Sequence, residues 1–216
     1  MIEESSLRYS HQIFSPIRGS RFDWHSFTGE VPFGDAIVDF ILNSIKRFEQ
    51  SGDILVRDRG WYEKRLRSNC FALLTTLGAD VPNFIGEPDK ILPHLAEHTV
   101  AFAFLDHYQA PLLIDSKPVD IEMAEICAVG NVATLTGIKR ENAKGGGIDA
   151  FQAAYQLARH TFPSATIVSW VHEHSFKSLQ NAFKDGYNLE IIPDALFRED
   201  EYKNPPHVCI AINRQI

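Results

Sequence analysis

The sequence lacks the features that define several protein classes. Its three cysteines, Cys70, Cys127 and Cys209, are widely spaced and include no CxxC pair, so they provide no disulfide framework. The longest uninterrupted apolar run, Val100–Leu105, is far shorter than the roughly 20 residues that a membrane-spanning helix needs. With 13 glycines and 11 prolines among 216 residues, the chain is also too poor in both for a low-complexity protein.

Positive charge is scarce as well. The chain has 21 Lys and Arg against 28 Asp and Glu, a formal net charge of −7, whereas a domain that coats nucleic acid normally has a basic excess. The first residues, MIEESSLRYS, are acidic and polar, unlike a secretory signal. We therefore expect a cytoplasmic protein that binds neither nucleic acid nor membrane.

What is present is the composition of an ordinary globular domain. Apolar residues make up 44% of the chain and charged residues 23%. A length of 216 residues favours one large domain over two. No repeat, charge run or Ser/Gly linker divides the chain, so we expect a single domain over residues 1–216.

Local patterns in the first 120 residues predict one amphipathic helix and several strands. Phe33–Gln50 carries apolar side chains at helical spacing, and Ser51-Gly52 ends this helix. Asn69–Leu77 is apolar and fits either a buried strand or a helix. The expected strands are Leu7–Phe14, Thr99–Leu105 and Ala110–Asp115, with a turn at Ser116-Lys117-Pro118 after the last of them.

The rest of the chain alternates strands with helices, which predicts an α/β domain. A helix, Ile148–Phe162, has apolar side chains every three or four residues, and Thr166–Val171 is a continuous apolar run typical of a central strand. A second helix, Phe176–Lys184, is expected to end with Gly186 as a left-handed cap. The remaining expected strands are Ile121–Thr136, Tyr187–Ile192 and Val208–Asn213.

A glycine-rich turn, Gly145-Gly146-Gly147, lies between a strand and a helix. Side-chain-free N–H groups at a helix start can bind an anion such as phosphate, and Lys139, Arg140 and Lys144 add local positive charge. Neither GxxxxGK[ST] nor GxGxxG is present, so the turn matches neither of these nucleotide-binding motifs. The glycines could instead form a plain surface turn.

The order of these elements, together with three short motifs, points to a known family. The turn reads Asn142-Ala143-Lys144-Gly145-Gly146-Gly147. Ser175 and Ser178 lie near the start of the second helix, which is followed by Gly186-Tyr187. This arrangement resembles the GNAT superfamily of acyl-CoA N-acyltransferases, whose turn has the pattern Q/R-x-x-G-x-G/A. Asn142 replaces the usual Gln or Arg, and Ser175 replaces the usual Asn. The resemblance covers roughly Ile121 to Asn213.

The resemblance implies a mixed, mostly antiparallel twisted sheet with two splayed central parallel strands, flanked by helices. Acetyl-CoA or another acyl-CoA would lie in the splay as the co-substrate. Residues 1–120 would form the acceptor side, and residues 121–216 would bind the acyl-CoA. The acceptor would be a small-molecule or peptide amine, and formation of a homodimer is left open. The implied cofactor-binding residues are Val129, Lys144, Gly145, Gly146, Gly147, Ile148, Ser175 and Ser178.

Acyl transfer to an amine needs a base for the ammonium proton. Glu122 and Glu125 are three residues apart on the expected strand, hence on opposite faces. Glu125 is flanked by Ala124 and Ile126, and burial would raise its pKa, so we favour Glu125 as the base. His172, at the end of the central strand, is a second candidate. Either glutamate could instead be a charged residue on a solvated face.

The acid and metal candidates leave other functions open. The Tyr that often protonates the thiolate in the family is replaced by Ala182 and Phe183, and Tyr155 or Tyr187 could substitute for it or serve only in packing. No metal is expected at the site. A GNAT-fold binding protein without catalysis is one alternative. Residues 94–98 (HLAEH) match HxxEH, so a zinc-dependent hydrolase is another.

Overall fold

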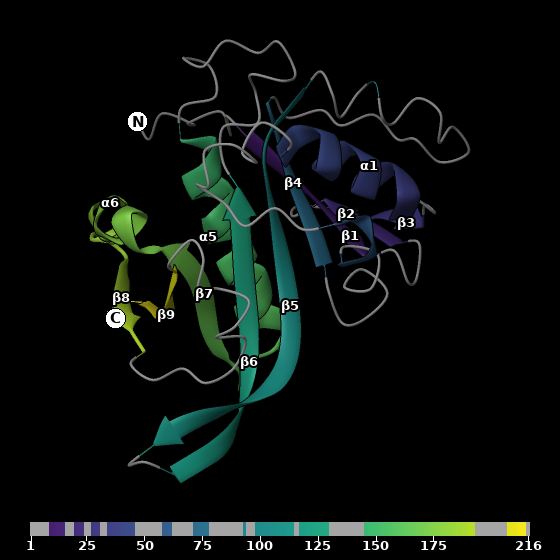
Figure 1. Cartoon of the computed structure of the whole chain (residues 1–216). Helices are drawn as coiled ribbons and strands as arrows, with labels where there is room; N and C mark the ends of the chain where they lie inside the picture. The colour runs from purple at the N-terminus through teal and green to yellow at the C-terminus, as the bar shows by residue number, and fades with distance from the viewer. Residues whose placement is uncertain are drawn as a thin grey trace, which may run out of the picture.

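The computed structural model of the protein describes part of the chain. It comprises residues 9–15, 20–23, 27–30, 34–45, 58–61, 71–77, 93, 98–114, 117–129, 145–192 and 207–214. Within these ranges, all strands form one nine-stranded sheet in the order β3-β2-β1-β4-β5-β6-β7-β9-β8. The chain therefore builds one continuous sheet with helices packed against it (Figure 1).

The first strands form an antiparallel section of this sheet. They are β1 (Tyr9–Ser15), β2 (Ser20–Asp23), β3 (Phe27–Glu30) and β4 (Phe71–Leu77). The predicted first helix is confirmed as α1 (Gly34–Ile45), which lies beside these strands in Figure 1. Its predicted residues 46–50 lie outside the described part.

A long hairpin forms the centre of the sheet. The two strands expected at 99–105 and 110–115 are one strand, β5 (Thr99–Ile114), which pairs with β6 (Lys117–Val129) along the whole length of β6. The turn expected at residues 116–118 was misplaced, because β6 already begins at Lys117. β4 pairs with β5 only between Thr99 and Leu105, so the far end of the hairpin projects beyond the other strands (Figure 1).

The C-terminal elements make the sheet mixed. They are α5 (Gly146–Thr161), β7 (Thr166–His172), α6 (Glu173–Phe183), β8 (Tyr187–Ile191) and β9 (His207–Arg214). β7 is parallel to β6, and β9 lies antiparallel between β7 and β8. The predicted mostly antiparallel sheet with a central parallel pair is therefore confirmed.

One detail of this half was predicted wrongly. Gly186 is not a left-handed cap, because Gly145 is the positive-φ glycine among the described residues. Helix α6 ends in a turn that stays right-handed at Lys184, and the N–H of Gly186 donates to the carbonyl of Phe183. A helix can end in such a turn without the left-handed residue that often follows a C-terminus.

Helix α5 covers one face of the central strands and forms the main core. Ala150, Ala154 and Ala158 recur every fourth residue, and each is at most 1% exposed. Small side chains at this spacing let the helix axis lie close to the sheet. The helix packs on β4, β5 and β6. The sheet residues of this core include Ala103, Leu105, Ala124, Ile126, Ile167 and Ile210.

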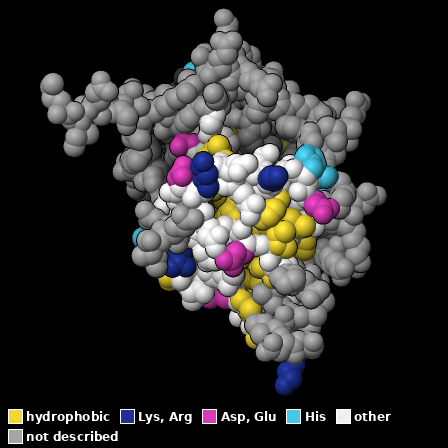
Figure 2. All heavy atoms as spheres, turned by 90° about the vertical axis from the view of Figure 1, so that its left-hand side faces the viewer, with side chains coloured by type: hydrophobic (Ala, Val, Ile, Leu, Met, Phe, Trp, Pro, Cys, Tyr) yellow, Lys and Arg dark blue, Asp and Glu magenta, His cyan; other side chains and the backbone are white. Residues whose placement is uncertain are grey.

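Two observations describe the molecule from outside. None of the helices in the described part is long and apolar enough to cross a membrane. The face that carries α6, β8 and β9 shows charged side chains of both signs, set singly among apolar and uncharged groups (Figure 2).

Candidate active site

The central parallel strands pair over a short distance and then separate. Three register pairs join β6 to β7, and the last of them is Glu125 with Val168. Beyond it β6 continues over Ile126–Val129 and β7 over Ser169–His172, each still paired with its outer neighbour. The two strands therefore form a V (Figure 1), as the splay predicted from the sequence requires.

A side chain holds the narrow end of this V. The hydroxyl of Ser169 donates to the backbone carbonyl of Ile126 at 2.6 Å, and Ser169 is buried. Ile126 is the first β6 residue past the last register pair. A buried carbonyl needs a donor, and here a side chain supplies it where strand pairing stops.

The glycine turn lies at the wide end of the V. A β6–α5–β7 crossover between parallel strands places the start of α5 at the carboxyl ends of both strands. Gly145 caps the helix with φ 90° and ψ −10°, and its carbonyl accepts the first intrahelical bond, from the N–H of Asp149 at 2.9 Å.

The backbone donors of this turn precede the helical ladder. The N–H groups of Gly146, Gly147 and Ile148 come before Asp149, and no capping side chain bonds at Gly145. A side chain at Gly145 would meet no atom within 4 Å, so the turn borders open space. Val129 ends β6 on the same side. Lys144 lies outside the described part, as do Lys139, Arg140 and Asn142.

Glu125 lies on the sheet face opposite α5, at the vertex of the V. It is 4% exposed, and its cross-strand partner Asp106 is 8% exposed. The hydroxyl of Tyr108 donates to Oε2 of Glu125 at 2.6 Å. This burial confirms the prediction that Glu125 is the glutamate shielded from solvent. Ala124 and Ile126 face α5, so Glu125, which lies between them on the strand, faces away from the helix.

An apolar cluster lies on the same face of the sheet as Glu125. Met123, Val168 and Cys209 are buried in it, and Tyr108 and Trp170 pack against it. Burial, followed by the charge of Glu125, raises the pKa of the Cys209 thiol to about 12. This thiol stays protonated near neutral pH and is a poor nucleophile.

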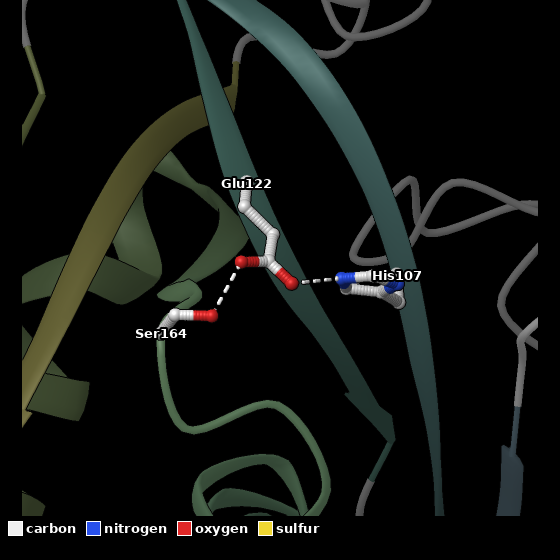
Figure 3. Close-up of polar contacts among 3 residues, drawn as sticks. All are labelled: His107, Glu122 and Ser164. Carbon is white, nitrogen blue, oxygen red and sulfur yellow. Dashed lines mark hydrogen bonds and ion pairs between the residues drawn. The ribbon is translucent and has the colours of Figure 1, made fainter.

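Glu122 is held in a different network on the other face (Figure 3). Its Oε2 accepts from the hydroxyl of Ser164 at 2.5 Å, and its Oε1 lies 2.7 Å from Nε2 of His107. The His107 ring stacks on Phe162 with centroids 4.0 Å apart. The hydrogen bond from Ser164, then the one from His107, lowers the pKa of Glu122. Because the carboxylate stands between serine and histidine, His107 is not placed to activate Ser164 as a nucleophile.

Three histidines meet at the end of β7. Alternation along β7 puts His172 on the same face as Val168, the register partner of Glu125. His172 caps α6, its Nδ1 accepting from the N–H of His174 at 3.4 Å, and its ring lies 4.0 Å from that of His174 and 5.3 Å from that of His207. The described residues contain no group of three His, Cys, Asp or Glu side chains arranged to hold a metal.

The remaining sequence candidates have these positions. Ser175 is half-buried and Ser178 exposed, both in the first half of α6. Tyr155 and Tyr187 pack edge to face at 4.9 Å, in and against the main core, as the packing interpretation expects. Within the HxxEH motif, His98 is described, while His94 and Glu97 lie outside the described part.

Sequence reasoning missed the partners of both glutamates. Tyr108 and His107 are neighbours on β5, and Ser164 precedes β7. The sequence signal for them is the polar stretch Asp106-His107-Tyr108 near the end of an expected strand, which fits either part of an acceptor pocket or a plain turn. Long-range pairing of β5 with β6 makes this stretch part of the site.

Comparisons with known proteins complete the description. No protein-family model and no curated protein matches the sequence. The GNAT domain of S. lividans PAT is 11% identical, with a TM-score of 0.44 and coverage of 86% of both chains. A GNAT acetyltransferase from Streptococcus pneumoniae is 12% identical, with a TM-score of 0.43 and coverage of 84% of this chain and 93% of that one. Arabidopsis thaliana NAA60 is 10% identical, with a TM-score of 0.43 and coverage of 80% and 94%. At these identities the likeness concerns the fold.

Proposed function

We propose that the protein is an acyl-CoA-dependent N-acyltransferase of the GNAT type, with acetyl as the simplest acyl group. The observation that carries this proposal is the V between β6 and β7, with the glycine turn at its wide end. The separated strand edges offer backbone groups to an extended pantetheine chain. The N–H groups at the start of α5 offer convergent donors to a pyrophosphate.

The proposed cofactor-binding residues are those at the turn and beside the V. The pyrophosphate would accept from the N–H groups of Gly145, Gly146, Gly147 and Ile148, while Lys144 adds positive charge beside them. Val129, at the end of β6, would border the pantetheine, and Ser175 and Ser178 would approach from α6. In this proposal the whole chain is one domain, with the acceptor side in residues 1–120 and the acyl-CoA side in residues 121–216.

The proposed reaction is a direct attack of the acceptor on the thioester. Glu125 takes one proton from the acceptor ammonium, the amine nitrogen bonds to the carbonyl carbon, and the C–S bond breaks. CoA leaves as a thiolate and takes up the second proton that the nitrogen loses, Glu125 returns the first proton to solvent, and the products are an amide and free CoA. His172, on the same face further along β7, is the second candidate for the base. A covalent route through Cys209 is disfavoured, since the pKa of its thiol is raised to about 12.

Thermal unfolding with equal concentrations of acetyl-CoA, a long-chain acyl-CoA and ATP tests the binding half of the proposal. A ligand at 100 times its dissociation constant adds about 2.7 kcal/mol to the free energy of unfolding. For a chain of this length the midpoint should rise by about 5–10 °C. A rise with a CoA ester but not with ATP supports the proposal, and no rise with any of the three contradicts it.

A second candidate is a GNAT-shaped protein that binds CoA esters without catalysis. The observation in its favour is that Ala182 and Phe183 stand where the family often has its acidic Tyr, and Phe183 is buried in the core. Turnover separates the two candidates. If acetyl-CoA shifts the midpoint but a panel of small amines and peptides yields no free CoA, this second function is the correct one.

A further inference from the structure

His172 is the last residue of the β7 arm of the V, directly before α6 (Figure 1). The last register pair is Glu125 with Val168, and four residues further along the two strands are Val129 and His172. At about 3.3 Å per residue, each strand end lies roughly 13 Å beyond the vertex. Alternation puts the His172 side chain on the face of Val168 and Glu125. His172 therefore borders the wide end of the V, across the opening from Val129.

The capping bond of His172 determines which ring nitrogen carries the proton. His172 is the N-cap of α6, and its Nδ1 accepts the backbone N–H of His174 at 3.4 Å. A backbone N–H can only donate, so Nδ1 contributes its lone pair and carries no proton. In a neutral imidazole the proton is then on Nε2. The capping ring is therefore an N–H donor at Nε2, and its lone pair is already used by the cap.

Two further histidine rings pack against this one. The ring centroid of His174 lies 4.0 Å from that of His172, and the ring centroid of His207 lies 5.3 Å from it. His207 is the register partner of His172, so the pairing of β7 with β9 fixes the position of this neighbour. His172 is half-buried, and within the described part of the chain the bond at Nδ1 is the one hydrogen bond of its ring. Nε2 can therefore donate to a ligand in the V.

We infer that His172 binds the outer half of the CoA ester through its Nε2–H and is not the base, an inference that rests on the proposed acyl transfer. In that reaction the thioester lies near Glu125, at the vertex. The ligand then passes His172 with its pantothenyl chain or its pyrophosphate, and both carry oxygens that accept a hydrogen bond. A neutral N–H supplies a donor there without placing a full positive charge at the N-terminus of α6. The role of the base remains with Glu125.

Two substitutions at this position separate the donor from the cap. Asparagine is a good N-cap, so H172N keeps an acceptor for the N–H of His174 but has no group that reaches the position of Nε2. Glutamine brings its amide nitrogen near that position, so H172Q keeps the donor and weakens the cap. We expect H172N to raise the dissociation constant of acetyl-CoA about tenfold, with little change in the unfolding midpoint. H172Q should bind acetyl-CoA within about threefold of the wild type and unfold at a lower temperature.

Truncated ligand and kinetics give two further readouts for H172N. S-acetylpantetheine lacks the pyrophosphate. An equal loss of affinity for this ligand indicates a bond to the pantothenyl chain, and a loss for acetyl-CoA alone indicates a bond to the pyrophosphate. In acyl transfer the change should appear in KM for acetyl-CoA, because a binding contact is removed. A fall in kcat of about 100-fold or more at unchanged KM would make His172 the base and overturn the inference.

Nitrogen NMR of the histidine rings tests the tautomer without ligand or turnover. At about pH 8, where an ordinary histidine is neutral, the His172 ring should carry its proton on Nε2, and the spectrum of H172N assigns its signals. A proton on Nδ1 overturns the inference whatever the protein binds. If the wild type binds no CoA ester, the proposed function fails and this inference fails with it. If the wild type binds acetyl-CoA and H172N binds it equally tightly, the role of His172 alone is overturned.

Discussion

Glu122 and Glu125 are three residues apart on β6 and lie in opposite environments. Glu125 is buried among apolar side chains, whereas the side chain of Glu122 is 34% exposed beside Ser164 and His107. Strand alternation alone predicts that the two carboxylates face opposite ways. It does not predict their partners, which are 15 to 42 residues away in sequence and depend on the register of the whole hairpin and on the crossover.

The network at Glu122 should make stability depend on pH. The pKa of Glu122 is lowered in the folded state, so its contribution to stability is complete well above the ordinary glutamate value of 4.5 and is lost as the pH falls through the lower folded value. Glu122→Gln should therefore lower the free energy of unfolding at pH 7, and the difference from wild type should shrink below about pH 4.5. Denaturant unfolding from pH 7 to pH 3 measures this difference.

Asp120→Asn is the matched control for this prediction. Asp120 is exposed on the same strand, and the variant should follow the wild-type curve across the whole pH range. A Glu122→Gln curve that runs parallel to the wild-type curve down to pH 3 would show that the carboxylate contributes nothing as an ion.

The backbone geometry of two elements of the site can be tested by substitution, and the glycine turn is the first of these elements. At Gly145 the φ angle of 90° strains any residue with a side chain, although the space around it is open. Gly145→Ala should cost about 1–2 kcal/mol of unfolding free energy and weaken acetyl-CoA binding. Gly186→Ala is the matched control, since Gly186 also has open space but no positive φ, and it should cost less. Equal losses in the two variants would refute the conformational argument.

The second element is the side-chain hydrogen bond at the vertex of the V. Ser169→Ala leaves the carbonyl of Ile126 without its side-chain donor, which should lower stability by about 1–3 kcal/mol. It should also raise the dissociation constant of acetyl-CoA, because the spacing of β6 and β7 is no longer fixed. Titration calorimetry and denaturant unfolding measure the two effects.

Ser164→Ala serves as the control for that variant, because it removes a hydroxyl from the Glu122 network, which lies on the side of the three β6–β7 register pairs away from the V. Its affinity for acetyl-CoA should match that of the wild type. If both serine variants bind acetyl-CoA as the wild type does, Ser169 does not define the V.

The local sequence predicted those elements whose apolar pattern is contained entirely in their own residues. The apolar period of α5 and the continuous apolar run of β7 are of this kind, and both were predicted close to their observed bounds. β2 and β3 were missed, since strands of four residues such as SRFD and FTGE have no pattern of their own and exist by pairing with β1 and with each other. The polar residues in the middle of β5 hid its continuity because their partners lie on other elements.

At the scale of the whole molecule, neighbouring strands of the sheet pair over very different lengths. β5 and β6 share a continuous ladder from Phe102 and Val129 to Ile114 and Lys117, whereas β6 and β7 share three register pairs. Helix α5 packs on β4, β5 and β6, and the core that it forms also includes Ile167 of β7 and Ile210 of β9, so this helix is the other main link between the two sides. The sequence contains no sign of this uneven joining, because no linker or change of composition accompanies it.

We call the short junction between β6 and β7 the seam, and it should be visible in native-state hydrogen exchange. Amides of β7, β9 and β8 should open at a lower free energy than those of β5 and β6, since fewer backbone bonds tie them to the rest. Acetyl-CoA bound between β6 and β7 should slow exchange on both sides of the seam. Uniform opening energies across the sheet, with or without acetyl-CoA, would contradict this expectation.

The three-pair junction between β6 and β7 also has a consequence for cooperativity. Without a ligand, the C-terminal strands are held to the β1–β6 section by three register pairs and by side-chain packing in the core that both share, and calorimetric unfolding should be broader than a two-state transition. A molecule that fills the V contacts both sections at once, so neither can open without releasing it. The unfolding transition should then sharpen as well as rise in temperature, because the ligand adds a second link between the two sections beside their shared core.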